Sequence, residues 1–517
     1  MRPRGCKATG WLNRIERLGN ALPDPVFIFL ALIGVLVAAS VAAASAGWRA
    51  QNPLTGSLMQ AESLLSEANL ARLLTDMPQT LTGFPPLGLV LTVMMGAAVA
   101  ERAGLFTALI GNAMRHVSNR LLSPSVFIIG VLSHHASDAA YVVLIPLAAL
   151  IYANAGRHPL AGIAIAYAGI SGAFAGNFIP GQFDVLMLGI TAPAARLLDP
   201  SWVMNPLGNW WFTAAIGLVF TPIAWYITDH IVEQRLGTWT REGEAASLIT
   251  PQTDLTPEQK KGLSRAGLAA LFLVAGFATL ALWPGYTPLI DETATGPARL
   301  SPLFQSLIAG FFLLFLSTGW VYGHAAGTIT SHRDVVRMMG EGLRTIAPWL
   351  VIVFFAAHFV AMFGWSNMGP ILAIKGAAIL ADLALPVGLL LVVLLLLSAV
   401  FDIFIGSASA KWAAMAPIVV PLLMLLGVTP DMTTAAYRMG DSIFNIVTPV
   451  ASNFPLVLIL CQRWASGFGV GSVIALMLPY SLAFGAAGLL LVASWASLGL
   501  PVGPAAPSRM PIPIATS

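Results

Sequence analysis

Two blocks of sequence decide the fold: S-A-S-A-K-W-A-A-M-A-P at 407–417 and Y-R-M-G-D-S-I-F-N-I-V-T-P-V-A-S-N-F-P at 437–455. Long apolar runs flank them on both sides, so we expect both blocks to lie at membrane depth. They nevertheless contain Lys411, Arg438 and Asp441. A charged side chain at the centre of a bilayer costs roughly 2.5 kcal/mol or more and is rarely placed there without a use. Interrupted helices that carry such groups are typical of a transporter's binding site.

A shift of 271 positions without a gap aligns this region with an earlier one. The helix breakers then coincide, Gly156 with Gly427 and Pro159 with Pro430. Because Gly and Pro set where helices end, these matches carry more weight than apolar ones. The sequence therefore predicts an internal repeat. Its other identities are Ala139 with Ala410, Pro146 with Pro417, Ala164 with Ala435, Gly169 with Gly440, Ser171 with Ser442 and Phe183 with Phe454.

The composition is that of a polytopic membrane protein. Of 517 residues, 57% are hydrophobic and 9% are charged, and the mean hydropathy is +0.80. The net charge of +3 says little about partners, and we expect no nucleic-acid partner. Cys6 and Cys461 suggest neither a disulfide nor a metal motif. The apolar run 26–47 is about twice as long as a normal signal h-region, so we expect a retained first span after an amphipathic surface helix, with cleavage as the alternative.

The distribution of Lys and Arg predicts the topology. Apolar segments that could cross a membrane fall near 25–47, 84–100, 210–228, 266–284, 301–321, 345–364 and 470–497. Alternate loops contain sixteen Lys and Arg against six, which places the N-terminus in the cytoplasm. The remaining apolar stretches then fit two re-entrant hairpins of opposite orientation, each followed by a broken helix. We expect an all-α protein with about nine spans, an inverted repeat and an external C-terminus.

The expected units are as follows: 1–83, a surface helix, first span and external loop; 84–228, the first repeat with hairpin 124–156 and broken helix 159–195; 229–344, a cytoplasmic linker and scaffold spans; 345–499, the second repeat with hairpin 385–427 and broken helix 430–462; and 500–517, a disordered tail rich in Pro and Ala.

Hairpin tips at 133–138 and 406–411, and breaks near 172–184 and 442–455, are the expected sites of chemistry. Freed backbone carbonyls and side-chain oxygens in such breaks suit Na⁺. The predicted ion ligands are Asn177, Ser171, Ser442, Asn445 and Thr448. Proton coupling through Asp184 or Asp441 is the alternative.

Other residues have structural as well as functional interpretations. Arg438 and Asp441 lie three apart on one helical face and could pair with each other. Asp402 could carry a proton or pair with Lys411, whose neighbour Trp412 suits an aromatic acid. His358 fits a packing role.

His134 and His135 at the first tip form too weak a pattern for a metal site, and we have no account of them.

Several blocks resemble the aminobenzoyl-glutamate transporter (AbgT) family, nearly end to end. They are W-L-N-R-I-E-R-L-G-N-A-L-P-D-P, S-D-A-A-Y-V-V-L-I-P, G-R-H-P-L-A-G, F-D-V-L-M-L-G-I-T, S-A-S-A-K-W-A and A-A-Y-R-M-G-D-S-I-F-N-I-V-T-P. The resemblance implies a bowl-shaped homodimer with nine spans and two opposed hairpins in each subunit. It implies import of aminobenzoyl-glutamate, or export of folate-pathway intermediates and sulfonamides.

Carried over by motif, the resemblance also implies a set of substrate positions. Asn177 is followed by Phe178, where the family usually has Leu, so the sequence keeps the asparagine but departs from the family pattern beside this expected ion ligand. The implied substrate positions are Asp184, Ser409, Trp412, Arg438, Asp441 and the helix-break prolines Pro430 and Pro449, to which we add Lys411.

The leading hypothesis is a secondary transporter of an aromatic carboxylate in the bacterial inner membrane, driven by an ion gradient. A proton-driven drug exporter of the same fold is the second hypothesis. A membrane enzyme is the alternative from another class, but no nucleophile, base and orienting group cluster in the sequence. No G-x-x-x-x-G-K-[ST] motif for a primary pump is present, and we expect no cofactor.

Overall fold

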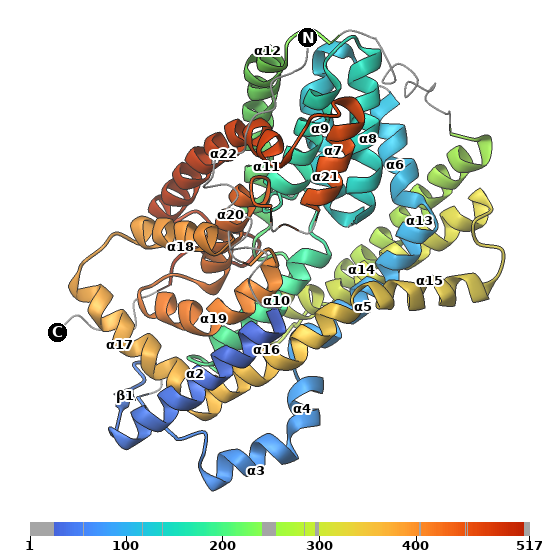
Figure 1. Cartoon of the computed structure of the whole chain (residues 1–517). Coiled ribbons are helices and arrows are strands. Elements are labelled where there is room, and N and C mark those ends of the chain that lie inside the picture. Colours follow the sequence, from blue (N-terminus) through green and yellow to red (C-terminus); the bar gives the residue numbers. More distant parts are fainter. Residues whose placement is uncertain are drawn as a thin grey trace.

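The computed structural model describes residues 25–54, 56–115, 117–136, 138–239, 255–283, 285–294, 299–402, 405–449, 451 and 453–510. Helices dominate the fold (Figure 1), as the composition predicts. The predicted surface helix before Pro25 lies outside the described residues.

The predicted apolar segments are all helical. They correspond to α2 (Pro25–Ser45), α5 (Pro85–Arg102), α11 (Trp210–Ile227), α13 (Pro257–Leu282), α14 (Ser301–Ala326), α16 (Ala347–Trp365) and α22 (Val470–Leu498). In the described part of the chain, seven helices are long and apolar enough to cross a membrane. The bent pair made of α5 and α6 (Leu105–Arg115), with 59° between its helices, would be an eighth span. The protein is therefore an all-α, multi-pass membrane protein, while the predicted count of nine stays a prediction.

The two predicted repeats share one pattern of helices. The first hairpin consists of η1 (Asn119–Leu121), α7 (Leu122–Leu132), η2 (Ser133–Ala136) and α8 (Asp138–Asn154). The second hairpin consists of α18 (Val387–Asp402) and α19 (Ala408–Leu425). The broken helices follow as α9 (Pro159–Tyr167), η3 (Ala168–Gly172) and α10 (Gln182–Arg196), and as α20 (Pro430–Asn445) and α21 (Phe454–Trp464).

Gly and Pro set these boundaries as the alignment predicts. Gly156 (φ +73°) and Gly427 (φ +82°) both take the left-handed conformation that ends a helix, and Pro159 and Pro430 both begin the next one. Each of the two helices that follow the turns is then interrupted, the first by a break at 173–181 and the second by a break at 446–453. Whether the hairpins are re-entrant and the repeats inverted stays a prediction.

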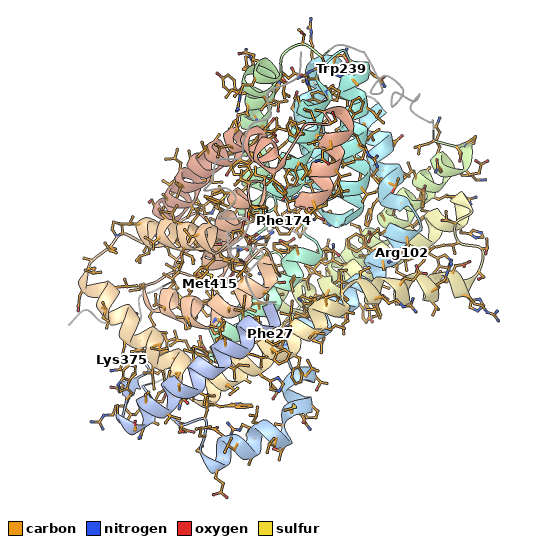
Figure 2. The ribbon with its side chains drawn as sticks, viewed as in Figure 1. Phe27, Arg102, Phe174, Trp239, Lys375 and Met415 are labelled. Atoms are coloured by element: carbon orange, nitrogen blue, oxygen red, sulfur yellow. The ribbon has the colours of Figure 1, made fainter. Side chains whose placement is uncertain are left out.

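The two repeats are interlocked. α10, the second half of the first broken helix, packs on α19 of the second hairpin. In turn α21, the second half of the second broken helix, packs on α8 and α9. In Figure 1, α7, α8, α9 and α21 lie together in the upper part, and α10 and α19 lie below them. Phe174, in the first break, lies near the centre of the molecule (Figure 2), where these two groups meet.

The remaining elements form the periphery. An antiparallel strand pair, β1 (Arg49–Gln51) and β2 (Leu58–Gln60), lies next to α17 (Met368–Asp382). The other peripheral helices are α3 (Glu67–Thr75), α4 (Met77–Thr82), the π-helix η4 (Thr228–Val232), α12 (Glu233–Leu236) and α15 (His332–Thr345). At the start of α15, hydrogen bonds from Thr330 and Ser331 lower the pKa of Asp334 to about 2.

The prediction of a disordered tail is wrong for residues 500–510. Val502 and Ala506 are buried, and the Nδ2 of Asn205 donates to the carbonyl oxygen of Pro504 at 3.0 Å. Close packing explains the difference, because a Cβ at Gly503 would lie 2.1 Å from the carbonyl oxygen of Leu207. The expected linker is also shorter than predicted, since η4 and α12 prolong α11 and α13 begins at Pro257.

Candidate functional site

A cavity of about 380 Å³ lies where both breaks and both hairpins meet. The hairpins and breaks of both repeats line it, together with α5, α15 and α16. They are Val90, Met94, His134, Tyr141, Ile170, Ser171, Phe174, Gln182, Phe183, Leu186, Thr345, Ile346, Trp349, Gly406, Ala408, Asn445, Ala451 and Asn453. This size lies within the range of pockets that bind small molecules.

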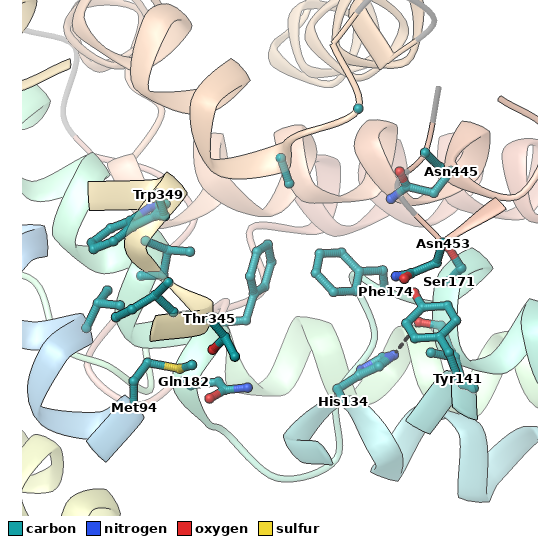
Figure 3. Close-up of a pocket in the computed structure, with 18 residues that line it drawn as sticks. Met94, His134, Tyr141, Ser171, Phe174, Gln182, Thr345, Trp349, Asn445 and Asn453 are labelled. Atoms are coloured by element: carbon teal, nitrogen blue, oxygen red, sulfur yellow. Dashed lines mark hydrogen bonds between the residues drawn. The ribbon is translucent and has the colours of Figure 1, made fainter. Parts of the chain in front are cut away.

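The lining combines aromatic rings with neutral polar groups (Figure 3). The ring centres of Phe174 and Phe183 are 4.4 Å apart. Trp349 lies at the end of the cavity opposite to Asn445 and Asn453. Asn445 and Asn453 of the second break lie near Ser171 of the first repeat. Such a cavity suits a ligand with an aromatic ring and several hydrogen-bonding groups.

An ion pair between Arg438 and Asp184 lies directly behind Phe183. The Nη1 of Arg438 is 2.7 Å from the Oδ1 of Asp184, and its guanidinium lies 5.0 Å from the centre of the Phe183 ring. Both side chains are buried. Asp184 also accepts the backbone N–H of Gly181 at 2.8 Å, so it fixes the start of α10 as well as pairing with α20.

A second buried ionic cluster joins the second hairpin to α20. The Nζ of Lys411 lies 2.8 Å from Asp402 and 2.7 Å from Asp441. The Nδ2 of Asn445 donates to the other oxygen of Asp441 at 3.2 Å, and Asn445 itself lines the cavity. Asn445 therefore connects this cluster to the cavity.

Arg438 and Asp441 do not pair with each other, although such a pair was one of the two interpretations of their spacing. Each pairs with a residue of another element, Arg438 with Asp184 and Asp441 with Lys411. The alternative that pairs Asp402 with Lys411 is confirmed. The two pairings tie α20 to α10 and to α19, which explains why α20 is buried along nearly its whole length.

The predicted substrate residues lie mostly behind the cavity wall. Asp184, Lys411, Trp412, Arg438 and Asp441 are buried and do not line it. The indole N–H of Trp412 donates to Thr191 at 2.8 Å, and its ring stacks on Tyr437 at 4.3 Å. Trp412 thus packs α19 against α10 and α20. Three other predicted residues lie outside the lining: Ser409 near Trp349, Pro430 at the start of α20, and Pro449 in the second break.

The predicted ion ligands separate into two groups. Ser171 and Asn445 line the cavity. Ser442 instead accepts the backbone N–H of Ala175, and the Oδ1 of Asn177 accepts that of Ile179 at 3.2 Å. These bonds support the first break. Thr448 is buried in the second break.

The structure shows the contacts of the two tip histidines, His134 and His135, and of His358. His134 lines the cavity, with its Nε2 2.9 Å from the carbonyl oxygen of Ile170, and His135 packs against Gly181 so closely that a Cβ there would clash. The Nδ1 of His358 lies 2.7 Å from the carbonyl oxygen of Phe354, in keeping with packing. Among the described residues, no group of three His, Cys, Asp or Glu side chains could hold a metal ion.

Sequence reasoning missed several lining residues, notably Tyr141, Phe174, Thr345 and Trp349. Phe174 lies in the predicted break, so the break itself was a usable signal. Thr345 and Trp349 lie in or beside the apolar segment 345–364, where nothing in the sequence distinguishes a residue that lines a cavity from one that faces lipid.

Comparison with known proteins gives consistent matches over nearly the whole chain. The model of the AbgT putative transporter family matches residues 10–510. The p-aminobenzoyl-glutamate transport protein of Escherichia coli (strain K12) is 36% identical over 498 residues, which are 96% of each chain.

Two solved structures are similar in fold and sequence. The YdaH transporter of Alcanivorax borkumensis, described as having an unusual topology, has a TM-score of 0.86 and 37% identity over 93% of this chain and 100% of its own. MtrF of Neisseria gonorrhoeae, described as illuminating a class of antimetabolite efflux pumps, has a TM-score of 0.89 and 39% identity over 96% and 100%.

Proposed function

Because the chain belongs to the AbgT putative transporter family, we propose that it carries aminobenzoyl-glutamate-like aromatic carboxylates across the bacterial inner membrane by secondary active transport. The cavity between the two breaks is the observation that carries this proposal. It is formed by the interrupted segments of both repeats, which is the usual position of a secondary transporter's substrate site.

The lining suits the parts of such a substrate. Phe174, Phe183, Tyr141 and Trp349 offer aromatic faces for a benzoyl ring. Ser171, Asn445 and Asn453 offer hydrogen bonds to amide and carboxylate groups. The cavity is large enough for a ring with a glutamyl side arm.

Arg438 would bind a substrate carboxylate only after Phe183 moves. Its guanidinium lies behind the Phe183 ring and is held by Asp184. We therefore propose that Phe183 separates the substrate from Arg438 in this conformation, and that its displacement lets the carboxylate compete with Asp184 for the cation.

Topology and assembly belong to the same proposal. We propose nine spans with two opposed re-entrant hairpins in each subunit of a homodimer, a cytoplasmic N-terminus and an external C-terminus. Cysteines introduced at Ser133 and Ser407 should then react with impermeant reagents from opposite membrane faces. Reaction of both from one face would contradict the inverted arrangement.

Coupling to an ion gradient is also proposed. Ser442 and Asn177 already accept backbone N–H groups, which leaves fewer free oxygens for Na⁺ than the sequence predicts. The two buried ionic clusters offer carboxylates next to the cavity. These observations favour a proton over Na⁺ as the coupling ion.

Export of sulfonamide-type antimetabolites and folate-pathway intermediates is the second candidate. The similarity to MtrF, at a TM-score of 0.89, favours it. The same cavity would serve both functions, because sulfonamides and aminobenzoyl-glutamate share a para-substituted aniline ring.

The test is flux in proteoliposomes with labelled aminobenzoyl-glutamate and, separately, a labelled sulfonamide, under imposed Na⁺ or proton gradients. Phe174→Leu and Asn445→Ala should raise KM for the transported compound. Phe27→Leu is the matched control, because Phe27 is 63% exposed on the outer side of α2. Unchanged flux in both cavity variants would contradict the site, and the gradient that concentrates substrate identifies the direction.

A further inference from the structure

The two buried ionic clusters differ in their charge balance. Arg438 and Asp184 form a one-to-one pair. Lys411, in contrast, serves two carboxylates, Asp402 and Asp441, and all three side chains are at most 2% exposed. With every group ionised, this second cluster has a net charge of −1. A net charge buried away from water is costly unless a bound cation or a proton neutralises it.

One carboxylate oxygen is available for that neutralisation. The Oδ1 of Asp402 contacts Lys411, whereas its Oδ2 is buried and makes no hydrogen bond within the described part of the chain. Asp441 differs, because its Oδ1 contacts Lys411 and its Oδ2 accepts the amide of Asn445. The Oδ1 of Asp441 makes an ion pair without a hydrogen bond, so among the described residues the Oδ2 of Asp402 is the one carboxylate oxygen of the cluster that has neither.

We propose that Asp402 binds the proton that couples transport, within the cluster Asp402–Lys411–Asp441. This inference rests on the proposed transport function and adds the coupling site to it. The step is an acid–base equilibrium: an O–H bond forms at the Oδ2 of Asp402, and the charge of the cluster changes from −1 to 0. On release, the proton passes to water on the side to which the site opens.

The surroundings favour a proton over Na⁺ at this place. The Lys411 ammonium already lies between the two carboxylates and would repel a second metal cation held by the same oxygens. A site for Na⁺ also needs several converging oxygen ligands, and the Oδ2 of Asp402 has no hydrogen-bonding neighbour among the described residues. A proton needs only that oxygen.

Other titratable groups near Asp402 come from several elements. Tyr437 of α20 donates its hydroxyl to the carbonyl oxygen of Ala408 at 2.6 Å, and its ring lies 5.8 Å from the Nζ of Lys411. Tyr167 of α9 donates to the carbonyl oxygen of Asn445 at 3.1 Å. On α22, which packs on α18, the titratable side chain is Tyr480, and its hydroxyl is hydrogen-bonded to that of Thr228. Apart from Lys411 and Asp441, these groups are phenols, and each of them makes a hydrogen bond of its own.

Asn445 connects this proton site to the substrate. Its side chain contacts Asp441 and also lines the cavity. An anionic substrate in the cavity adds negative potential near the cluster, which favours the protonated form. By reciprocity, the protonated form favours the anionic substrate. The proposal therefore predicts that substrate and proton bind together, as in symport.

The experiment measures proton uptake when aminobenzoyl-glutamate binds to the purified full-length protein in weakly buffered detergent solution with a pH-sensitive dye. The wild-type protein should take up about one proton per substrate bound. Asp402→Asn should bind substrate without proton uptake and lose accumulation driven by a pH gradient, while substrate exchange persists. This variant should fold, because it leaves Lys411 and Asp441 as a neutral pair.

Two further variants complete the test. Asp402→Glu keeps the acid and should retain proton uptake. Asp382→Asn removes an exposed carboxylate at the end of α17 and should behave as wild type. Proton uptake in Asp402→Asn equal to wild type, proton release on binding, or accumulation driven by Na⁺ alone would overturn the inference. Absence of aminobenzoyl-glutamate binding to the wild-type protein would instead contradict the proposed function.

Discussion

The two predicted repeats have helix ends and turns at equivalent positions, but different chemistry. α8 ends at Asn154 and α19 ends at Leu425, at equivalent positions of the alignment, and the Gly156 and Gly427 turns follow with the same left-handed conformation. The buried charges are not repeated. The positions equivalent to Lys411 and Arg438 are Ala140 and Tyr167 in the first repeat.

The equivalent turns are also held in different ways. At the first turn, Arg157 pairs with Asp229 and, at 2.8 Å, with Glu233. At the second, the hydroxyl of Thr429 donates to the carbonyl oxygen of Pro507 at 2.7 Å, and the N–H of Met510 donates to that of Gly427 at 2.9 Å. The difference teaches that the repeat determines the path of the backbone, while each half acquires its own side chains for binding and for support.

The largest difference between the two repeats in the effect of a mutation on transport and stability is expected at the equivalent positions Arg438 and Tyr167. Arg438→Ala leaves Asp184 buried without its cation, which should abolish transport and cost about 3–5 kcal/mol of stability. Tyr167→Phe removes one hydrogen bond, to the carbonyl oxygen of Asn445, and should cost about 1 kcal/mol. Flux and thermal unfolding measure both, and equal losses would contradict the asymmetry.

Asp441→Ala should also abolish transport, because Lys411 would retain only Asp402 and the contact with Asn445 would be lost. Normal flux in both Asp441→Ala and Arg438→Ala would exclude these clusters from the mechanism.

The aligned glycines Gly169 and Gly440 should respond alike. A Cβ at Gly440 would lie 2.1 Å from the carbonyl oxygen of Leu395, and one at Gly169 would lie 2.7 Å from that of Phe127. Each Gly→Ala change should therefore push two helices apart and cost about 1–3 kcal/mol. Gly111→Ala on α6 is the control, since its Cβ would meet no atom within 4 Å. Tolerance at one aligned site alone would show that the helix contacts are not repeated.

The two supports of the turns can be removed separately. Truncation after Leu500 removes the buried side chain of Val502, which should lower the free energy of unfolding by about 2 kcal/mol. It also removes the hydrogen bonds of the tail to Gly427 and Thr429 and should loosen the start of α20. Arg157→Gln should loosen the start of α9 by a similar or smaller amount. Proteolysis near each turn measures the effect. Cleavage at the second turn in Arg157→Gln, or at the first turn after truncation, would contradict independent supports.

The smallest effects should come from the turn glycines. Both Gly156 and Gly427 have a positive φ, so alanine at either turn meets backbone strain, and a Cβ at Gly156 would meet no atom within 4 Å. We expect each substitution to cost about 1 kcal/mol, measured as a decrease in Tm. A clearly larger cost at one turn would show that the two turns are not equivalent.

Much of the fold could be predicted because membrane helices are defined by local sequence. Apolar runs gave the long helices, and Gly427 and Pro430 gave a helix boundary without tertiary information. The segment 500–510 was mispredicted because its order depends on distant partners such as Asn205, which composition does not register.

The charged residues beside the cavity could be identified from the sequence, whereas their contacts and much of the cavity lining could not. A charge at membrane depth is visible in the sequence, so Lys411, Arg438 and Asp441 were identified. The partner of Arg438 is 254 residues away, and only the fold brings Asp184 to it. The same reason explains why Trp349 of α16 could not be assigned to the cavity.

The supports of the two turns have a consequence for biosynthesis. Arg157 lies 72 residues before Asp229 and 76 before Glu233, and Thr429 lies 78 residues before Pro507. Each repeat is thus fastened by the chain that the ribosome makes shortly after it. The first repeat acquires its fastening before α18 of the second has been synthesised, so insertion can proceed one repeat at a time, from the N-terminal half to the C-terminal half.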